Sequence, residues 1–373
     1  MLNGQWTGTY TGANSGHIRL NLDNRGDRYS GVAFLLDRDP KLPNLVAGIQ
    51  TKDKADEFHI KTAYILPIDP RLGTGVAWDQ IKDVYPDVTM ATAADVHGIR
   101  NEDSLELTWK ADTGNKGKAT LVRTPLDAPT DYVPLNRTWD EFKAYVLGLK
   151  PQNYLFRGQR KGWRLRTHFH RTRRADLGPF RTIDIPTLHR RLSARTRHTY
   201  NLEVPNELGA FYSLIQHHGY PTPILDWTYS PYMAAFFAYH RIAPSVAASA
   251  ENKEERVRVF IFHLQEWLTD YQQYLSLDID MPHFSHIDFF AFDNERLVAQ
   301  QATSTVTNVD DIEQYVRGCE ASRGKQYLEL VDLPMRERPK VMSELSYMGI
   351  TAGTMFPGLD GACEELKERF FEL

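Results

Sequence analysis

Hydrophobic and polar residues alternate in short runs along the first 125 residues of the chain. In the run HIRLNL, Ile18, Leu20 and Leu22 alternate with polar residues, and a period of two places such side chains on one face of a strand. The turn-forming clusters DNRGD and DTGNKG lie between the runs. Short strands joined by tight turns are typical of antiparallel sheets. The pattern therefore predicts a β sandwich or small barrel over residues 1–125, with a less regular excursion at residues 78–98.

A stretch with three prolines follows, and it predicts a linker over residues 126–137. Beyond it, the apolar positions of WDEFKAYVLGL recur at helical spacing, and Thr138 with Glu141 has the residue types and spacing of a capping box. Helical and extended patterns then mix to the last residue. We expect a mixed α+β domain over residues 138–373, and an α+β fold class for the whole chain.

Two further segments have the pattern of helices. PNELGAFYSLIQHHG is expected to begin at an Asn206 cap and to end at Gly219, because asparagine caps helix N-termini and glycine commonly follows C-termini. SPYMAAFFAYHRIA carries Pro231 in its first turn, where proline is favoured. RVRVFIFHL has the composition of a buried strand.

The composition, net charge and cysteine count narrow the class of protein. The composition, with 42% hydrophobic and 25% charged residues, is that of a globular chain. A formal net charge of −4 gives no general attraction to nucleic acid or membranes. Two cysteines, Cys319 and Cys363, fit a reducing compartment, and no stretch approaches the roughly 20 apolar residues of a membrane span. We therefore expect a cytoplasmic protein without membrane contact.

One segment departs from this balance. Between Arg157 and Arg197 basic residues are dense, and Asp176 and Asp184 are the only acids. The segment is either a solvated face balanced by acids elsewhere, or a surface for phosphates of a dinucleotide or a nucleic-acid backbone. The residues alone leave both interpretations open.

Several common site motifs are absent from the sequence. It contains no Walker loop, dinucleotide-binding glycine motif, serine nucleophile elbow or HExxH zinc motif. Two histidine clusters, THFH at His168 and His170 and HFSHID at His283, His286 and Asp288, lack a complete set of metal ligands. We therefore predict no metal site, and no nucleophilic role for either cysteine.

Two motifs carry a resemblance to a known family. YLFRGQR and QHHGYPTPILDWTYSPYMAAFFA are similar to the signature of the FRG domain, which is named for Phe-Arg-Gly. The matching positions are Phe156, Arg157, Gly158 and Gln159, then Gln216, His217, Gly219, Pro221, Thr222, Leu225, Asp226, Trp227 and Thr228. The resemblance extends over roughly residues 139–366 and leaves the first 125 residues unassigned.

A later family element, Asn-x-Arg followed by Gln, is matched by Asn294, Arg296 and Gln300. The glycine and aromatic residue that follow it in the family are replaced by Ala302 and Ser304. Pro223 also stands where an arginine often follows the Pro-Thr pair. These departures leave the geometry of the third element open.

The resemblance implies an arrangement like that of ADP-ribosyltransferases, with NAD as the substrate, and a place in bacterial toxin or phage-defence systems. On that basis the expected catalytic residues are Arg157, Asp226 and Glu295. The expected NAD-binding residues are Arg157, Gly158, Gln159, His217, Thr222, Trp227, Thr228, Asn294, Arg296 and Gln300.

The first motif has residue types suited to such a ligand. The fork of Arg157 can bind a pyrophosphate or ribose, or it can form a buried ion pair with Asp226. Gly158 allows the backbone to approach a ligand. Gln159 can bond a carboxamide or a neighbouring loop.

The second motif offers similar alternatives. Trp227 can stack on a ligand ring or pack in the core. Thr228 or Ser230 can cap the following helix. His217 can orient a ribose hydroxyl or bond the loop backbone.

A carboxylate near the ribose would stabilise the oxocarbenium character that develops when the glycosidic bond of NAD breaks. The candidates are Asp226, Glu207 and Glu295, and Glu295 is the best positional analogue in the late element. Glu207 has another explanation, because it lies in the first turn of a predicted helix and favours the helix dipole.

Two other function classes stay open at this level. The chain could be a nucleic-acid-directed module or nuclease that uses the Arg157–Arg197 segment, or a non-catalytic interaction protein. In each case the N-terminal β domain is expected to recognise a target or a protein partner.

Overall fold

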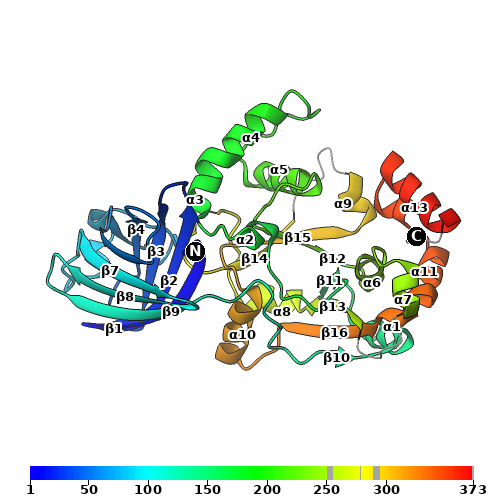
Figure 1. Cartoon of the computed structure of the whole chain (residues 1–373), viewed down its shortest axis with the longest axis horizontal. Helices are drawn as coiled ribbons and strands as arrows, with labels where there is room; N and C mark the ends of the chain where they lie inside the picture. Colours follow the sequence, from blue (N-terminus) through cyan, green and yellow to red (C-terminus); the bar gives the residue numbers. More distant parts are fainter. Residues whose placement is uncertain (250–254, 278, 289–294, 372–373) are drawn as a thin grey trace.

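The computed structural model describes residues 1–249, 255–277, 279–288 and 295–371. Two β-sheets organise the described chain, one near each end of its long axis (Figure 1). The first contains only N-terminal strands, and the second is surrounded by helices. This arrangement confirms the predicted α+β class. None of the described helices is long and apolar enough to cross a membrane.

The first sheet is antiparallel throughout and has the strand order β5-β7-β8-β9-β1-β2-β3-β4-β6. Its strands are β1 (Gly4–Gly12), β2 (Ser15–Asn24), β3 (Tyr29–Asp37), β4 (Leu45–Gln50), β5 (Glu57–Lys61), β6 (Ile65–Pro67), β7 (Ala94–Asn101), β8 (Ser104–Ala111) and β9 (Lys116–Val122). Only two short 3-10 turns, Trp78–Gln80 and Lys82–Val84, lie in the excursion between β6 and β7.

The two ends of this sheet meet at the segment between β5 and β6. The amide of Thr62 donates to Ala94 O beside β7, at 2.9 Å, and the amide of Ala63 donates to Gly48 O of β4, at 2.9 Å. The amide of Gly48 in turn donates to Tyr64 O. The chain from β5 to β6 thus pairs with β7 at its start and with β4 at its end, so the sheet curls into a partly closed, barrel-like shape rather than a sandwich; it is called the barrel below.

The second sheet has the order β10-β16-β13-β11-β12-β15-β14. Its strands are β10 (Leu135–Asn136), β11 (Leu155–Gln159), β12 (Ile224–Thr228), β13 (Arg256–Phe262), β14 (Phe284–Ile287), β15 (Ala302–Thr307) and β16 (Leu328–Pro334). Only β10 and β16 run parallel to each other. β10 lies inside the stretch predicted as a linker, which is therefore tied to this sheet at its end.

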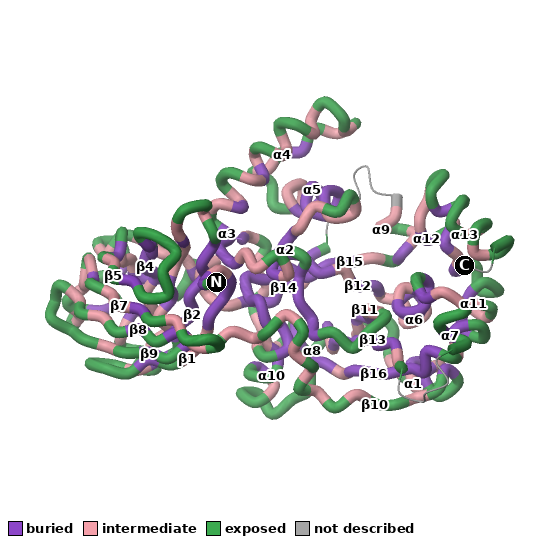
Figure 2. Tube along the Cα trace, in the orientation of Figure 1, coloured by how far each residue is buried: buried purple, intermediate pink, exposed green. Residues whose placement is uncertain are grey.

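Helices cover both faces of the second sheet. They are α1 (Trp139–Leu147), α2 (His168–Arg171), α3 (Leu177–Pro179), a π-helical turn (Phe180–Asp184), α4 (Ile185–Leu192), α5 (Pro205–His217), α6 (Pro231–Tyr239), α7 (Pro244–Ser249), α8 (Leu264–Asp270), α9 (Glu295–Ala299), α10 (Ile312–Arg323), a 3-10 turn (Met335–Glu337), α11 (Arg338–Tyr347), α12 (Ala352–Met355) and α13 (Leu359–Phe371). α4 extends away from the sheet, and most of its residues are partly or fully exposed (Figures 1 and 2).

The alternation of β12 divides its side chains between these faces. Leu225 and Trp227 pack with α8 and α10 in one hydrophobic core. α6 packs on the other face, in a second core with α1 and α11. Asp226 and Thr228 therefore point toward the α6 side of the sheet, because successive strand residues face opposite ways.

Helix ends follow the predictions in part. Thr138 and Glu141 form the predicted capping box at α1, and Gly219 follows α5 with φ of 84°. The prediction of Asn206 as a cap is wrong: Val204 precedes α5, and Pro205 occupies its first turn. Because proline lacks an amide hydrogen, it leaves one fewer donor for a cap to satisfy.

The barrel is joined to the second part by buried polar contacts. Gln5 donates to Asn308 O at 2.9 Å, and Arg19 donates to Asn308 Oδ1 at 3.1 Å. Asp23, which is 1% exposed, accepts the amide of Ala175 at 2.8 Å. These contacts place the outer face of β1 and β2 against the α2–α3 region and the end of β15.

Candidate active site

A cavity of about 300 Å³ lies where β11, β12, α6 and the end of α5 meet. Arg157 and Asp226 both line it, as the resemblance implied. Its described lining residues are Phe156, Arg157, Gly158, His217, Asp226, Trp227, Thr228, Phe237, His240, Arg241, Gln300, Ala302 and Phe356. Asp226 is the one acidic residue among them.

The sheet brings the first two motifs together. β11 and β12 are neighbours, and Phe156 pairs with Thr228 across them. β12 then pairs along its whole length with β15, which follows the third element. Residues separated by about 70 positions in sequence thus share one end of the sheet.

Arg157 does not form the ion pair with the Asp226 carboxylate that the sequence left open. Its Nη1 donates instead to the main-chain oxygen of Asp226, which leaves the carboxylate for the cavity. Nε of Arg157 is buried and has no hydrogen-bond partner among the described residues. Burial lowers the pKa of the guanidinium, while the nearby Asp226 charge opposes this shift. The arginine is thus a partly buried cation whose buried Nε is an unused donor.

Gly158 lines the cavity, but its missing side chain has another cause. A Cβ at this position would lie 1.9 Å from Ala234 O and 2.7 Å from Ala238 N, both in α6. The glycine is required because α6 packs directly on β11. The absent Cβ therefore serves helix packing, and the role of Gly158 in ligand approach stays a prediction.

Trp227 contributes to the core. It is 2% exposed, its ring lies 5.7 Å from that of Phe262, and its Nε1 donates to Thr305 Oγ1 at 2.9 Å. Of the two alternatives, the structure shows packing, on the sheet face opposite the Asp226 side chain.

Replacing Trp227 with phenylalanine should lower the free energy of unfolding by about 2 kcal/mol, because it removes a buried hydrogen bond and part of a core ring. NAD affinity should stay within about twofold. Urea unfolding and NAD titration of the same samples check both expectations. Weaker binding at unchanged stability would mean that the ring stacks on the ligand.

Thr228 and Gln300 fix the edge of the cavity. Thr228 Oγ1 donates to Gln300 O at 2.8 Å and accepts the amide of Ser230 at 3.0 Å. Gln300 Nε2 donates to Met355 O at 2.7 Å. Ser230, not Thr228, is the cap of α6, because its hydroxyl accepts the amide of Met233. The bonds of Thr228 and Gln300, both predicted to bind NAD, therefore hold β12, the start of β15 and α12 together.

An aromatic wall, formed by Phe237, His240 and Phe356, faces the same cavity. The ring centroids of Phe237 and Phe356 are 6.1 Å apart, and those of His240 and Phe356 are 5.4 Å apart. Burial lowers the pKa of His240 to about 4, although Glu364 at 3.3 Å opposes the shift. His240 is therefore neutral at pH 7 and presents an uncharged ring. Sequence analysis missed these residues, because nothing in the local pattern places Phe237 and His240 beside Phe356, which lies much further along the chain.

A second cavity, of about 750 Å³, shares His217 with the first. His217 bonds Ser213 O through Nδ1 at 2.8 Å, so the structure shows a bond within its own helix. Arg195, Arg197 and Arg296 line this second cavity, and none of its described lining residues is acidic. The Arg296 guanidinium lies 5.6 Å from the centre of the Phe356 ring. The third element thus connects the arginine-lined cavity to the aromatic wall.

Three other candidates lie outside both cavities. Gln159 donates to Trp163 O at 2.8 Å. Thr222 is fully buried and donates to Gln216 Oε1. Glu207 accepts the amide of Asn201 at 2.7 Å and contacts His198. Each has a local structural bond. Asn294 lies outside the described residues, and Glu295 is placed only as the first residue of α9.

Acidic residues, most of them outside the segment, neutralise part of the basic segment. Arg164 binds Asp311 and Asp131, Arg166 binds Asp310, and Arg174 binds Asp23 and Asp184. These arginines join the parts of the chain rather than forming a continuous surface. The exposed remainder includes Arg160 and Lys161 after β11, and Arg190, Arg191 and Arg195 at α4 and its end.

Potential metal ligands gather elsewhere. Within the described ranges, one group of three suitable side chains occurs: Glu57, His59 and His97 on the barrel strands β5 and β7. Glu57 Oε1 lies 2.9 Å from His97 Nε2. Neither His170 nor His283 belongs to it; both are buried and bond neighbouring hydroxyls. The cavity beside Arg157 offers one carboxylate and no such group.

Comparison with known proteins identifies one part of the chain. The model of the FRG domain family matches residues 152–246, which include the Arg157 and Asp226 motifs. No curated protein matches the chain.

Several solved structures match about a third of the chain. A redesigned β barrel, b11L5F_LGL, is 16% identical, covers 33% of this chain and 92% of its own, and has a TM-score of 0.22. The redesigned barrel mFAP1, bound to DFHBI, is 17% identical over 33% and 94%, with a TM-score of 0.23. Rv2717c from M. tuberculosis is 15% identical over 33% and 93%, with a TM-score of 0.20.

Proposed function

Because the chain carries an FRG domain at residues 152–246, we propose that it cleaves NAD and transfers ADP-ribose to an acceptor or to water. One observation carries the proposal: a partly buried cation, a carboxylate and an aromatic wall line the same cavity. The resemblance of FRG proteins to toxin and phage-defence components extends the proposal to a defence effector, with the barrel recognising its target.

The two cavities match the two halves of a dinucleotide. The smaller lies at the lower end of the size range of ligand pockets, which suits a nicotinamide ring and its ribose. The larger, whose described lining includes Arg195, Arg197 and Arg296 and no acidic residue, suits the diphosphate and adenosine. Since both share His217, a single ligand can extend from one to the other.

The chemistry assigned to the cavity is simple. The bond between ribose C1′ and the nicotinamide nitrogen breaks, and its electron pair leaves with nicotinamide, which becomes neutral. The Asp226 carboxylate faces the resulting oxocarbenium ion and stabilises its charge. An acceptor nucleophile or water then bonds to C1′ and gives up its proton.

Arg157 and the aromatic wall position the substrate. The unused Nε donor of Arg157 can bond a ribose or phosphate oxygen, while its Nη1 stays fixed on the Asp226 backbone. The neutral ring of His240 and the rings of Phe237 and Phe356 offer flat apolar contacts to nicotinamide. A cavity bounded by buried groups also strengthens the electrostatic contact to Asp226.

The test is incubation of the full chain with NAD, followed by quantification of released nicotinamide and of mass gain on the protein. Nicotinamide should accumulate in proportion to protein. Replacing Arg296 with alanine should weaken NAD binding about tenfold, the scale of one charged hydrogen bond. The control is Arg190→Ala, an exposed α4 arginine outside both cavities. If the protein neither binds NAD nor releases nicotinamide from it, the proposal is overturned.

The exposed arginines of α4 support a second candidate, a nucleic-acid-binding module. Arg190 and Arg191 lie on α4, which extends from the sheet (Figure 1), and Arg195 lies shortly after its end. Nucleic-acid binding that weakens steeply with salt, in a protein that leaves NAD intact, would favour this alternative.

A further inference from the structure

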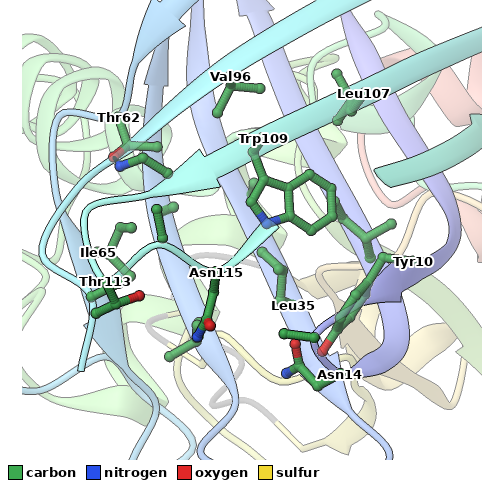
Figure 3. A pocket seen from close by; sticks show the side chains of 18 of the residues that line it. Tyr10, Asn14, Leu35, Thr62, Ile65, Val96, Leu107, Trp109, Thr113 and Asn115 are labelled. Atoms are coloured by element: carbon green, nitrogen blue, oxygen red, sulfur yellow. Dashed lines mark hydrogen bonds between the residues drawn. The ribbon is translucent and has the colours of Figure 1, made fainter. Parts of the chain in front are cut away.

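A separate cavity of about 340 Å³ lies inside the N-terminal barrel. Most of its lining is aliphatic or aromatic, and Figure 3 shows Leu35, Ile65, Val96, Leu107 and Trp109 arranged around it. No described residue of the FRG motifs lines it. It is therefore a second, independent site.

The cavity exists because the barrel is filled unevenly. Leu2, Trp6, Leu22, Leu105 and Leu121, which do not line the cavity, are fully buried and pack the half of the barrel near the start of β1. Toward the other end several inward positions carry alanine.

Alanine residues account for much of the cavity volume, because their side chains are too short to fill the interior. Ala33 of β3 and Ala47 of β4 are directly opposite each other, and both line the cavity together with Ala94 and Ala111. Larger residues at these positions would fill the interior, as in a barrel closed by its own side chains. The volume is a consequence of specific small residues.

The cavity reaches solvent at one end of the barrel. Asn14, Thr113 and Asn115 line it and are exposed, and they belong to the turns after β1 and β8. The half-buried Trp109 and Leu35 lie beside them. Partly exposed apolar side chains around an open cavity are the surface that an apolar ligand would cover.

The polar groups at this end select against an anion. Asp37 is the one charged residue among the described lining, and no lysine or arginine is present. Tyr10 donates to Asp37 Oδ2 at 2.7 Å, and Asn14 donates to the same oxygen. A ligand carboxylate would meet a negative group without a compensating cation, whereas a neutral group could bond the Asn14 or Asn115 amides.

We propose that the barrel binds an uncharged, mainly apolar small molecule, with its apolar body between Trp109 and the aliphatic strands and its polar end among Asn14, Thr113 and Asn115. The site accepts a molecule about the size of two fused rings and a substituent. Because it lies outside the FRG domain, its failure would leave the NAD proposal untouched.

Two probes with one aromatic skeleton test the proposal. N-phenyl-1-naphthylamine is neutral, and 8-anilinonaphthalene-1-sulfonate carries an added sulfonate. Each is titrated into the full chain, and both probe emission and quenching of tryptophan emission are recorded. The neutral probe should bind with one site per chain and at least tenfold more tightly than the anion. Quenching should fall when Trp109 is replaced by phenylalanine.

Filling the cavity provides the matched variants. Ala47→Leu, or the smaller Ala33→Val, should weaken the neutral probe at least tenfold, with the unfolding transition retained. Ala55→Leu, at an exposed loop alanine outside the cavity, should leave binding unchanged. Equal or tighter binding of the sulfonate would overturn the charge selectivity. Probe binding that both filling variants leave intact, or no binding by the wild type, would overturn the site itself.

Discussion

Replacing Asp226 with asparagine should lower the rate of NAD cleavage about 10²- to 10³-fold, the usual effect of losing one transition-state-stabilising group. Asparagine keeps the size of the side chain and removes its charge. The fold should tolerate the change, because the carboxylate is not the acceptor for Arg157: the Asp226 main-chain oxygen is. The free energy of unfolding should therefore change by less than about 1 kcal/mol.

Single-turnover measurement of nicotinamide release, with NAD titration of the same variant, checks this result. The rate should fall while the NAD dissociation constant changes little, since the charge acts mainly on the transition state. Asp127→Asn, at an exposed carboxylate far along the chain from the FRG motifs, is the control. If Asp226→Asn keeps the wild-type turnover, Asp226 does not stabilise the transition state, and Glu295 becomes the next candidate for this role.

Replacing Gly158 with alanine should destabilise the protein by about 3 kcal/mol or more, or prevent folding. The added Cβ would lie 1.9 Å from Ala234 O. A main-chain oxygen in α6 cannot rotate away as a flexible side chain can, so the helix must move off β11. Forced overpacking costs typically 1–3 kcal/mol and more where the backbone must shift.

Gly318→Ala is the matched control for this substitution. Gly318 lies in α10, and a Cβ there would meet no atom within 4 Å. Since alanine is a better helix former than glycine, the control should be neutral or stabilising by up to about 1 kcal/mol. Urea unfolding of both variants checks the pair. If Gly158→Ala matches its control, the close packing of α6 on β11 is not present in solution.

Part of the architecture could be predicted because it depends on local periodicity. The alternation in HIRLNL corresponds to β2, and the Thr138–Glu141 pair forms the capping box of α1. The Asn206 cap failed because Pro205 and Val204, one and two positions earlier, already determine how α5 begins. Local patterns compete over a few residues, and a sequence read by itself does not show which one is used.

The sequence predicted which residues gather at the candidate site, but it did not predict what each of them does there. Arg157, Asp226 and Gln300 come together as the motifs implied. Trp227 and Asp226 are adjacent, yet strand alternation directs one into the core and the other toward the cavity. Phe237, His240 and Phe356 could not be found in advance, because they reach the cavity only through the packing of α6 and α12.

The sequence by itself determined the strands of the first domain, the FRG motifs and the helix after Ser230, since these depend on short-range periodicity and on residue type. Only the tertiary structure decided that the first sheet curls around an apolar space, that Gly158 is required by a helix, and that Asp226 and three arginines border two cavities that share His217 as a lining residue. The physical reason is that closure, packing and electrostatics depend on contacts between residues far apart in the chain, which no local pattern records.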